Sequence, residues 1–230
     1  MNEIKKKIVI TGHSKGIGKK LSEYLVKIGH EVIGVSRSRN KNKKIIQYQC
    51  DISNNKKVIQ TFKKIKKFDV LINNSSITKF SKDPYKNFNK IIQTNLVGTF
   101  NCCNNSIKYL KGGVIINISS INSYLAFPNN PGYVSSKGGV RSLTKALALD
   151  YSNFKIRVNS ISPGYINDGM SKASFKNKLK NQQRLKRMIL KRWGTPEDLF
   201  GIVEYLFSSK SSYVTGQDFI VDGGWTSKGL

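Results

Sequence analysis

The chain has 230 residues, with 40 lysines and arginines against 13 aspartates and glutamates, which gives a formal net charge of +27. This length predicts one domain, residues 1–230, and no apolar run approaches the ~20 residues that would span a membrane. The apolar run before Thr11 is too short for a signal peptide, and the three cysteines form no Cys-x-x-Cys pattern. We therefore expect a cytoplasmic protein without disulfides or a metal site.

Short apolar runs alternate with helical patterns from one end of the chain to the other. The predicted strands are 8–10, 32–35, 45–48, 70–72, 114–118, 156–161 and 219–221. The predicted helices are 16–28, 55–66, 85–109, 132–152 and 196–207. Strands that are apolar on both faces predict an α/β fold, a single Rossmann-type doubly wound parallel sheet of about seven strands flanked by helices. Ligands of such a sheet bind beyond the carboxyl ends of its strands.

A glycine-rich stretch joins the first predicted strand to the first predicted helix. Glycines let the main chain approach a ligand closely, and a helix N-terminus offers unpaired N–H groups and the positive end of its dipole. The stretch therefore predicts a phosphate-binding turn, and a tight turn without a ligand is the alternative. The residues expected to bind are Gly12, Ser14, Lys15, Gly16, Ile17 and Gly18.

The positive charge allows two explanations. A nucleic-acid or membrane partner would use it directly. However, the chain has 33 lysines, 26 isoleucines and 22 asparagines, against 4 alanines and 7 arginines. The three abundant types have AT-rich codons, and a nucleic-acid binder is expected to use arginine for phosphate and base contacts. We therefore favour a genome bias, and expect neither a nucleic-acid nor a membrane partner.

Segment 171–192 differs from the rest because it carries nine basic residues and no acidic one. A solvated pair of helices would explain this composition. The functional alternative is a basic lid over the substrate site that attracts anionic ligands.

Several motifs follow one another in an order that is typical of one family. They are Asn73-Asn74-Ser75-Ser76, Asn95, Ser119-Ser120, Tyr133-x-x-x-Lys137 and the stretches 158–164, 192–198 and 213–224. In order and spacing they resemble the short-chain dehydrogenase/reductase family over nearly the whole chain. Members that resemble 3-oxoacyl-[acyl-carrier-protein] reductase look most similar.

The resemblance implies a catalytic set for hydride transfer to a carbonyl. Tyr133 would be the general acid and base, and Lys137, one helical turn away, would lower the pKa of the phenol and bind the nicotinamide ribose. The family's serine lies thirteen residues before its tyrosine, which selects Ser120 over Ser119. Asn95 resembles the family's helix-kinking asparagine, which supports a water in the proton relay.

The stretch after the second predicted strand bears on the choice of cofactor. Enzymes that use NAD place an acidic residue there for the ribose hydroxyls, whereas this chain has Arg37 and no acid. Arg37 and Lys15 suit a 2′-phosphate, so we favour NADP(H) over NAD(H). By resemblance, the other residues that contact the cofactor are Asp51 and Ile52 at the adenine, Asn74, Tyr133, Lys137 and Ile166.

Three residues depart from the family pattern. Ser76 replaces a glycine and is expected to crowd the adenosine ribose, which puts cofactor affinity in doubt. Asp168 stands where many relatives have threonine, near the carboxamide and pyrophosphate. His13 replaces a small residue in the first turn; we expect a position on the rim, and a contact with substrate or phosphate is the alternative.

These observations predict an NADP(H)-dependent oxidoreductase that transfers a hydride between nicotinamide and a ketone or secondary alcohol. The substrate would be a small molecule or carrier-bound, and a 3-oxoacyl group on an acyl carrier protein is the first candidate. A dehydrogenase or reductase of a sugar or another small secondary alcohol is the alternative, and a catalytically silent binding protein is a third. The resemblance also implies a homo-oligomer, a dimer or tetramer.

Overall fold

The computed structural model describes residues 5–110 and 112–228. Within these residues seven strands form one parallel sheet in the order β3-β2-β1-β4-β5-β6-β7. The sequence therefore predicted the number and direction of the strands correctly. Their bounds are β1 (Lys7–Thr11), β2 (Glu31–Ser36), β3 (Ile46–Gln49), β4 (Val70–Asn73), β5 (Val114–Ile118), β6 (Arg157–Pro163) and β7 (Asp218–Val221).

Helices connect most of these strands. The α-helices are α1 (Gly16–Lys27), α2 (Asn55–Ile65), α3 (Pro84–Ile92), α4 (Gly98–Ser106), α5 (Pro131–Asp150), α6 (Lys172–Lys176), α7 (Lys178–Arg187) and α8 (Phe200–Phe207). The helix predicted over 85–109 is divided by a π-helical turn, η1 (Gln93–Val97). The helix predicted over 196–207 begins as a 3-10 turn (Pro196–Leu199), where Thr195 and Asp198 form a capping box.

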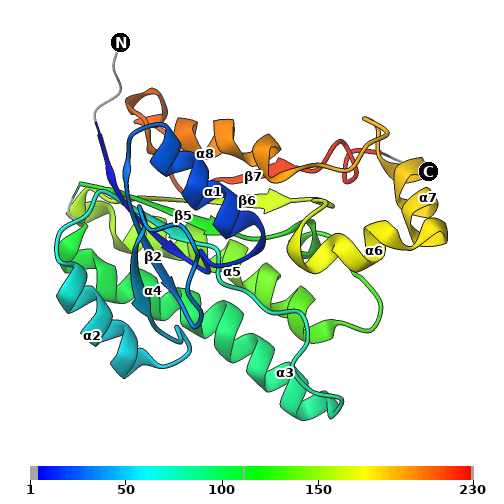
Figure 1. Cartoon of the computed structure of the whole chain (residues 1–230), viewed down its shortest axis with the longest axis horizontal. Helices are drawn as coiled ribbons and strands as arrows, with labels where there is room; N and C mark the ends of the chain where they lie inside the picture. The colour runs from blue at the N-terminus through cyan, green and yellow to red at the C-terminus, as the bar shows by residue number, and fades with distance from the viewer. Residues whose placement is uncertain (1–4, 111, 229–230) are drawn as a thin grey trace.

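Successive strand residues point to opposite faces of the sheet, and each face has its own core. Val9 packs with buried residues of α2, α4 and α5 on one face. Ile8 and Ile10 pack with buried residues of α1 and α8 on the other. Figure 1 shows α1 and α8 above the sheet and α2, α4 and α5 below it. This two-sided cover confirms the doubly wound arrangement.

The connection between β2 and β3 is unusually short. Adjacent parallel strands are normally joined by a crossover of a dozen or more residues, most often a helix. Here residues 37–45 make the connection without helix or strand. The sheet therefore lacks one covering helix beside β2, and other side chains cover that part of its surface.

Segment 171–192 forms α6 and α7, which lie at one end of the molecule (Figure 1). A third apolar cluster, around Trp193 and Trp225, packs against this pair of helices. The Arg184 guanidinium lies 4.6 Å from the centre of the Tyr165 ring and 5.8 Å from that of Trp193. The basic segment thus rests on aromatic side chains. Its action as a lid stays a prediction.

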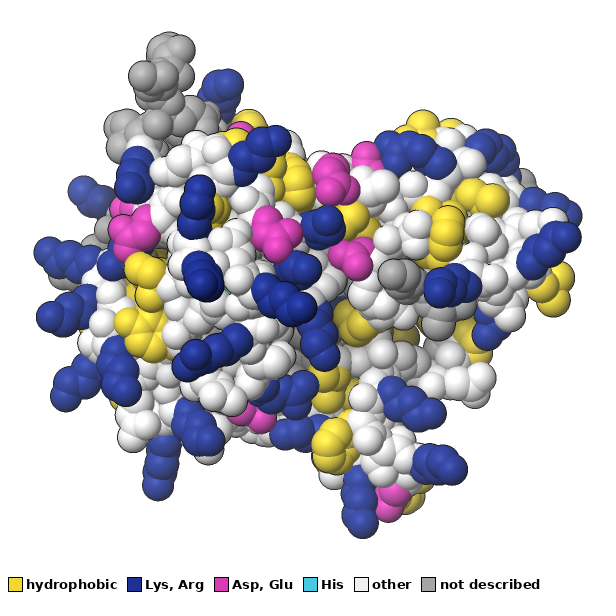
Figure 2. Space-filling view, viewed as in Figure 1, with side chains coloured by type: hydrophobic (Ala, Val, Ile, Leu, Met, Phe, Trp, Pro, Cys, Tyr) yellow, Lys and Arg dark blue, Asp and Glu magenta, His cyan; other side chains and the backbone are white. Residues whose placement is uncertain are grey.

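The positive charge covers the surface broadly. Figure 2 shows lysine and arginine side chains scattered over the whole visible face, with few acidic ones between them. None of the helices among the described residues is long and apolar enough to cross a membrane. The three cysteines, Cys50, Cys102 and Cys103, are buried and free.

Candidate active site

A cleft of about 520 Å³ opens at the carboxyl ends of the central strands. It lies where the strand order reverses between β1 and β4, which is the usual ligand site of a doubly wound sheet. The residues that line it and that the sequence predicted are Gly12, Ser14, Lys15, Gly16, Ile17, Arg37, Asp51, Ile52, Asn74, Ser120, Tyr133, Lys137 and Ile166. Of the predicted site residues, Gly18 and Asn95 do not line the cleft.

The turn after β1 is built around two glycines. Gly12 has φ +71°, and its N–H donates to the Val35 carbonyl at 2.8 Å. The Asn74 amide donates to the carbonyls of Thr11 and Gly12, each at 3.2 Å. A Cβ on Gly18 would lie 2.3 Å from that amide nitrogen and 2.4 Å from the Gly12 carbonyl oxygen. Gly18 therefore does not contact the cleft. Its missing side chain lets α1 pack closely against the turn.

The N-terminus of α1 has no side-chain cap among the described residues. Its N-cap residue, Lys15, makes no side-chain capping hydrogen bond, and the first turn carries no acidic residue. The first N–H groups of a helix need acceptors, and an anion at this end is also favoured by the helix dipole. The turn therefore suits a phosphate, and its binding of one stays a prediction.

Tyr133 and Lys137 lie one turn apart on α5. Lys137 is 3% exposed, and its side-chain nitrogen donates to the Ile118 carbonyl at 2.7 Å. The Lys137 nitrogen is 5.6 Å from the centre of the Tyr133 ring. Both side chains line the cleft. The structure thus brings together the two residues that the sequence proposed as a pair.

The pKa values of this pair differ from the sequence-based expectation. Burial raises the pKa of Tyr133, while the hydroxyls of Ser120 and Ser76 act to lower it. Burial also lowers the pKa of Lys137 to about 7. The lowered phenol pKa that the sequence predicted is therefore absent here. The physical reason is that the site desolvates both groups and so favours their neutral forms.

Ser120 and Ser119 have different roles. The Ser120 hydroxyl lies in the cleft and accepts from the Asn122 N–H at 3.2 Å. The Ser119 hydroxyl donates to the Lys137 carbonyl at 3.0 Å, which ties the end of β5 to α5. Ser120 is thus the serine that faces the phenol, and Ser119 supports the helix that carries it.

Ser76 is a further candidate for an effect on Tyr133, which sequence reasoning missed. It lines the cleft, its buried hydroxyl makes no hydrogen bond to the described residues, and its nearness acts to lower the pKa of the phenol. The expectation that Ser76 crowds the adenosine ribose considered only its size. The signal was present in the sequence as a hydroxyl in place of the family's glycine, but its direction toward Tyr133 depends on the fold.

Replacing Ser76 with alanine should raise the pKa of the Tyr133 phenol, because one hydroxyl that stabilises the phenolate is lost. Oxidation of an alcohol requires the phenolate, so its rate at neutral pH should fall about tenfold and recover at higher pH. The measurement is the pH profile of kcat/KM for oxidation. An unchanged pH profile in the variant would show that the Ser76 hydroxyl does not influence the Tyr133 phenol.

Asn95 lies within the π-helical turn and is 1% exposed. Its side-chain oxygen accepts from the Ile77 N–H at 2.9 Å, and its amide donates to the Ile77 carbonyl at 2.9 Å and the Ser136 hydroxyl at 3.1 Å. Asn95 therefore holds the segment that follows β4 against α5. Its support of a water in the proton relay stays a prediction.

The far end of the cleft carries the groups proposed for the adenosine half. Lys15 and Arg37 are exposed there, and the hydroxyls of Ser14 and Ser38 are 3.1 Å apart. Burial acts to raise the pKa of Asp51, but hydrogen bonds from Ser53 and the nearby cations lower it overall. A carboxylate at Asp51 is thus available to accept hydrogen bonds from a bound base.

The segment after β6 reaches the cleft through Ile166 and Asp168. Ile166 forms a parallel bridge with Gly194, and Asp168 accepts from the Gly169 N–H at 2.7 Å. Arg192 binds Asp198 through two hydrogen bonds of 2.7 and 2.8 Å. The predicted motif 192–198 therefore fixes the backbone that presents Ile166.

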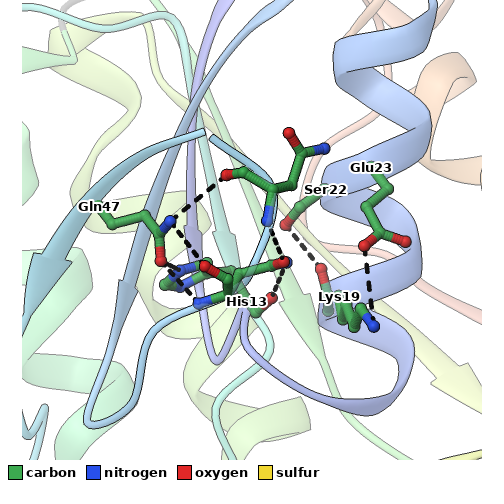
Figure 3. Close-up of polar contacts among 8 residues, drawn as sticks. His13, Lys19, Ser22, Glu23 and Gln47 are labelled. Atoms are coloured by element: carbon green, nitrogen blue, oxygen red, sulfur yellow. Dashed lines mark hydrogen bonds and ion pairs between the residues drawn. The ribbon is translucent and has the colours of Figure 1, made fainter. Parts of the chain in front are cut away.

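His13 is buried, with an exposed fraction of 1%, so its expected place on the rim is wrong. Its ring lies directly against Gly34 of β2. A Cβ on that glycine would lie only 2.2 Å from the imidazole, so the ring needs a glycine there. Its Nε2 lies 3.1 Å from the side-chain oxygen of Gln47. Figure 3 shows the two side chains facing each other. A histidine fits there because the short 37–45 connection leaves the sheet uncovered.

Comparison with known proteins shows which family has this geometry. A family model described as enoyl-(acyl carrier protein) reductase matches residues 12–226. Together with the cleft, the Tyr133–Lys137 pair and the sheet order, this decides the family. The chain belongs to the short-chain dehydrogenase/reductase family. Its members are oxidoreductases that bind nicotinamide cofactors.

Relatives with different functions are similar to the chain. The 3-oxoacyl-[acyl-carrier-protein] reductase FabG of Staphylococcus epidermidis is 31% identical over 95% of this chain and 98% of its own length. A short-chain dehydrogenase from Leptospira borgpetersenii with bound NAD+ is 32% identical, with a TM-score of 0.88 over 98% and 94% of the two chains. A putative 2-deoxy-D-gluconate 3-dehydrogenase from Agrobacterium tumefaciens with bound NADP is 28% identical, with a TM-score of 0.89 over 99% of each chain.

Proposed function

We propose that this protein is an NADP(H)-dependent reductase of ketones, with 3-oxoacyl groups on an acyl carrier protein as the first substrate class. The observation that carries the proposal is one cleft with a phosphate-binding turn at one end and Tyr133, Lys137 and Ser120 at the other. The cofactor would supply a hydride to the carbonyl carbon when bound. The FabG relative supports the choice of substrate.

Tyr133 is suited to donate a proton during reduction. Because burial raises its pKa, the phenol keeps its proton at neutral pH. The carbonyl oxygen becomes more basic as the carbon is reduced, and the phenol can then protonate it. Ser120 would hold that oxygen beside the phenol through its hydroxyl. These two groups supply the orientation and the proton.

Lys137 is suited to stabilise the phenolate left after this transfer. Its pKa of about 7 allows the amine to take up a proton when a negative charge forms beside it. Its hydrogen bond to the Ile118 carbonyl holds the nitrogen at the inner end of the cleft. Lys137 is also the residue expected to bind the ribose of the nicotinamide.

The substrate assignment is tested by following NADPH consumption with an acetoacetyl thioester and with a panel of oxidised sugars and sugar acids. We expect the thioester to be reduced with the highest kcat/KM. A clear preference for a sugar acid would favour the second candidate, a dehydrogenase of small secondary alcohols, which the Agrobacterium tumefaciens relative supports. No turnover with any carbonyl would favour a silent binding protein.

Arg37 gives a direct test of cofactor preference. Replacing Arg37 with aspartate removes a cation suited to a 2′-phosphate and supplies a carboxylate suited to ribose hydroxyls. We expect the ratio of kcat/KM for NADPH to that for NADH to fall about a hundredfold, the equivalent of about 2.7 kcal/mol. Steady-state kinetics with both cofactors measures this ratio. A ratio that does not move would contradict the assignment of Arg37 to NADP(H).

Assembly into a dimer or tetramer is also proposed. Large apolar side chains of α4 and α5 are exposed, among them Phe100 at 42% and Leu149 at 76%. Burial of such side chains between copies would be favourable. Light scattering coupled to size-exclusion chromatography measures the mass of the particle, and a monomer would contradict this proposal.

A further inference from the structure

The 37–45 loop carries Arg37 and Ser38 into the cofactor cleft, yet it has no helix to hold it. A nine-residue connection between parallel strands is short, and loops without regular structure are the more mobile parts of a fold. The position of Arg37 therefore depends on the contacts that the loop makes with the rest of the protein.

Three of these contacts are hydrogen bonds that meet at Asn40, which is 7% exposed. Its amide donates to the His13 carbonyl at 3.1 Å. The Asn40 N–H donates to the side-chain oxygen of Gln47 at 2.7 Å, and the Gln47 amide returns a hydrogen bond to the Asn40 carbonyl at 3.0 Å. Asn40 thus joins the loop to the phosphate turn and to β3 at once.

His13 completes this network from the side of the phosphate turn (Figure 3). The side-chain oxygen of Gln47 already accepts the Asn40 N–H, so the His13 Nε2 must carry the proton in their 3.1 Å contact. The imidazole fills the face of Gly34, which is the strand partner of Gln47. The ring therefore occupies the part of the sheet that a crossover helix would otherwise cover.

The network is close to the cation proposed for the cofactor. Asn40 follows Arg37 by three residues, and the Arg37 carbonyl accepts from the Gln49 amide at 2.9 Å. The Ser38 hydroxyl lies 3.1 Å from that of Ser14, which belongs to the phosphate turn. The loop is thus fixed on both sides of its cleft-facing residues.

We propose that His13 is a positioning residue for cofactor selection, which holds the 37–45 loop through Gln47 and Asn40 so that Arg37 meets a 2′-phosphate. The inference rests on the proposed preference for NADP(H) and extends it to a residue outside the cleft. It also explains why a buried histidine stands in the first turn. Deleting the imidazole removes its hydrogen bond to Gln47 and the ring that covers Gly34, while the Asn40 amide can still bond to the backbone carbonyl of residue 13 and the phosphate turn keeps its glycines.

The test uses two probes, adenosine 2′,5′-bisphosphate and adenosine 5′-monophosphate, bound to the full-length protein and measured by calorimetry. The ratio of their affinities isolates the contribution of the 2′-phosphate. The variants are His13→Ala, which removes the imidazole bond to Gln47, and Asn40→Ala, which removes the amide bond to the His13 carbonyl without removing the buried ring. His13→Gln is the conservative variant, because an amide keeps a donor for Gln47. Glu23→Gln is the matched control, since its contact with Lys19 at 3.9 Å lies outside the network (Figure 3).

We expect the affinity ratio to fall about tenfold in His13→Ala and in Asn40→Ala, the equivalent of one charge-assisted hydrogen bond to a phosphate. Binding of the monophosphate should stay close to that of the wild type, and His13→Gln should regain part of the ratio. An unchanged ratio in both alanine variants would overturn the inference. An equal loss for both probes would also overturn it, because it would reveal a purely structural role.

The two proposals fail in different ways. If the wild-type protein binds both probes equally, the NADP(H) preference and this inference are both overturned, whereas ketone reduction with NADH remains measurable. If the wild type prefers the bisphosphate and the variants keep that preference, only the role of His13 is overturned.

Discussion

Replacing Tyr133 with phenylalanine should reduce kcat for ketone reduction by about 10²- to 10⁴-fold, the usual contribution of a positioned general acid. The variant loses only the phenol oxygen, so the half-buried ring still packs on α5. Cofactor affinity should stay close to that of the wild type, because the phosphate turn and the adenosine end are untouched. Single-turnover kinetics with bound NADPH measures the chemical step directly.

A matched control for this variant is Tyr85→Phe, since Tyr85 is 82% exposed and lies on α3, outside the residues that line the cleft. Its activity should equal that of the wild type. A fully active Tyr133→Phe protein would contradict the assignment of the proton donor and with it the proposed mechanism.

The second large effect is expected from Gly18→Ala. The added Cβ would meet the Asn74 amide nitrogen at 2.3 Å and the Gly12 carbonyl oxygen at 2.4 Å. One of these atoms belongs to the backbone of the phosphate turn, so the turn and α1 must separate. Overpacking of this kind costs about 1–3 kcal/mol, and we expect a loss of that size in the free energy of unfolding. Cofactor affinity should fall by at least tenfold.

Gly201→Ala provides the control for Gly18→Ala. Gly201 lies in α8, and a Cβ added there meets no atom within 4 Å. The substitution should stabilise the helix by about 0.5–1 kcal/mol and leave cofactor binding unchanged. Chemical denaturation and cofactor titration of both variants give the comparison. Equal affinities in the two variants would mean that Gly18 does not shape the turn.

Much of the fold could be predicted from the sequence, because its strongest signals are local. Runs such as Val114–Ile118 are mostly apolar on both faces, with Asn117 the one polar residue, which predicts a strand buried between two layers of helices. The division of the helix predicted over 85–109 leaves no mark in the local hydrophobic pattern, and only the resemblance of Asn95 to a helix-kinking asparagine pointed to it. The π-helical turn there depends on the contacts of Asn95 with Ile77 and Ser136, which lie far from it in the chain.

The candidate site shows the same difference. Its residues could be selected by motif and spacing, and the structure brings Tyr133, Lys137 and Ser120 into one cleft. Their protonation could not be predicted, because the sequence supplies the charges but not the burial that opposes them. His13 is a similar case, since its burial follows from the absence of a helix between β2 and β3.

The uncapped N-terminus of α1 has a consequence for the stability of the protein. Lys15 and the first helical turn provide no acceptor for the amides at that end, so a bound dinucleotide would complete the helix as well as serve the reaction. The protein without nucleotide should therefore melt at a lower temperature than the protein with nucleotide bound. As nucleotide is added, the melting temperature should rise with the logarithm of its concentration. A cell short of this nucleotide would then hold less of the folded protein.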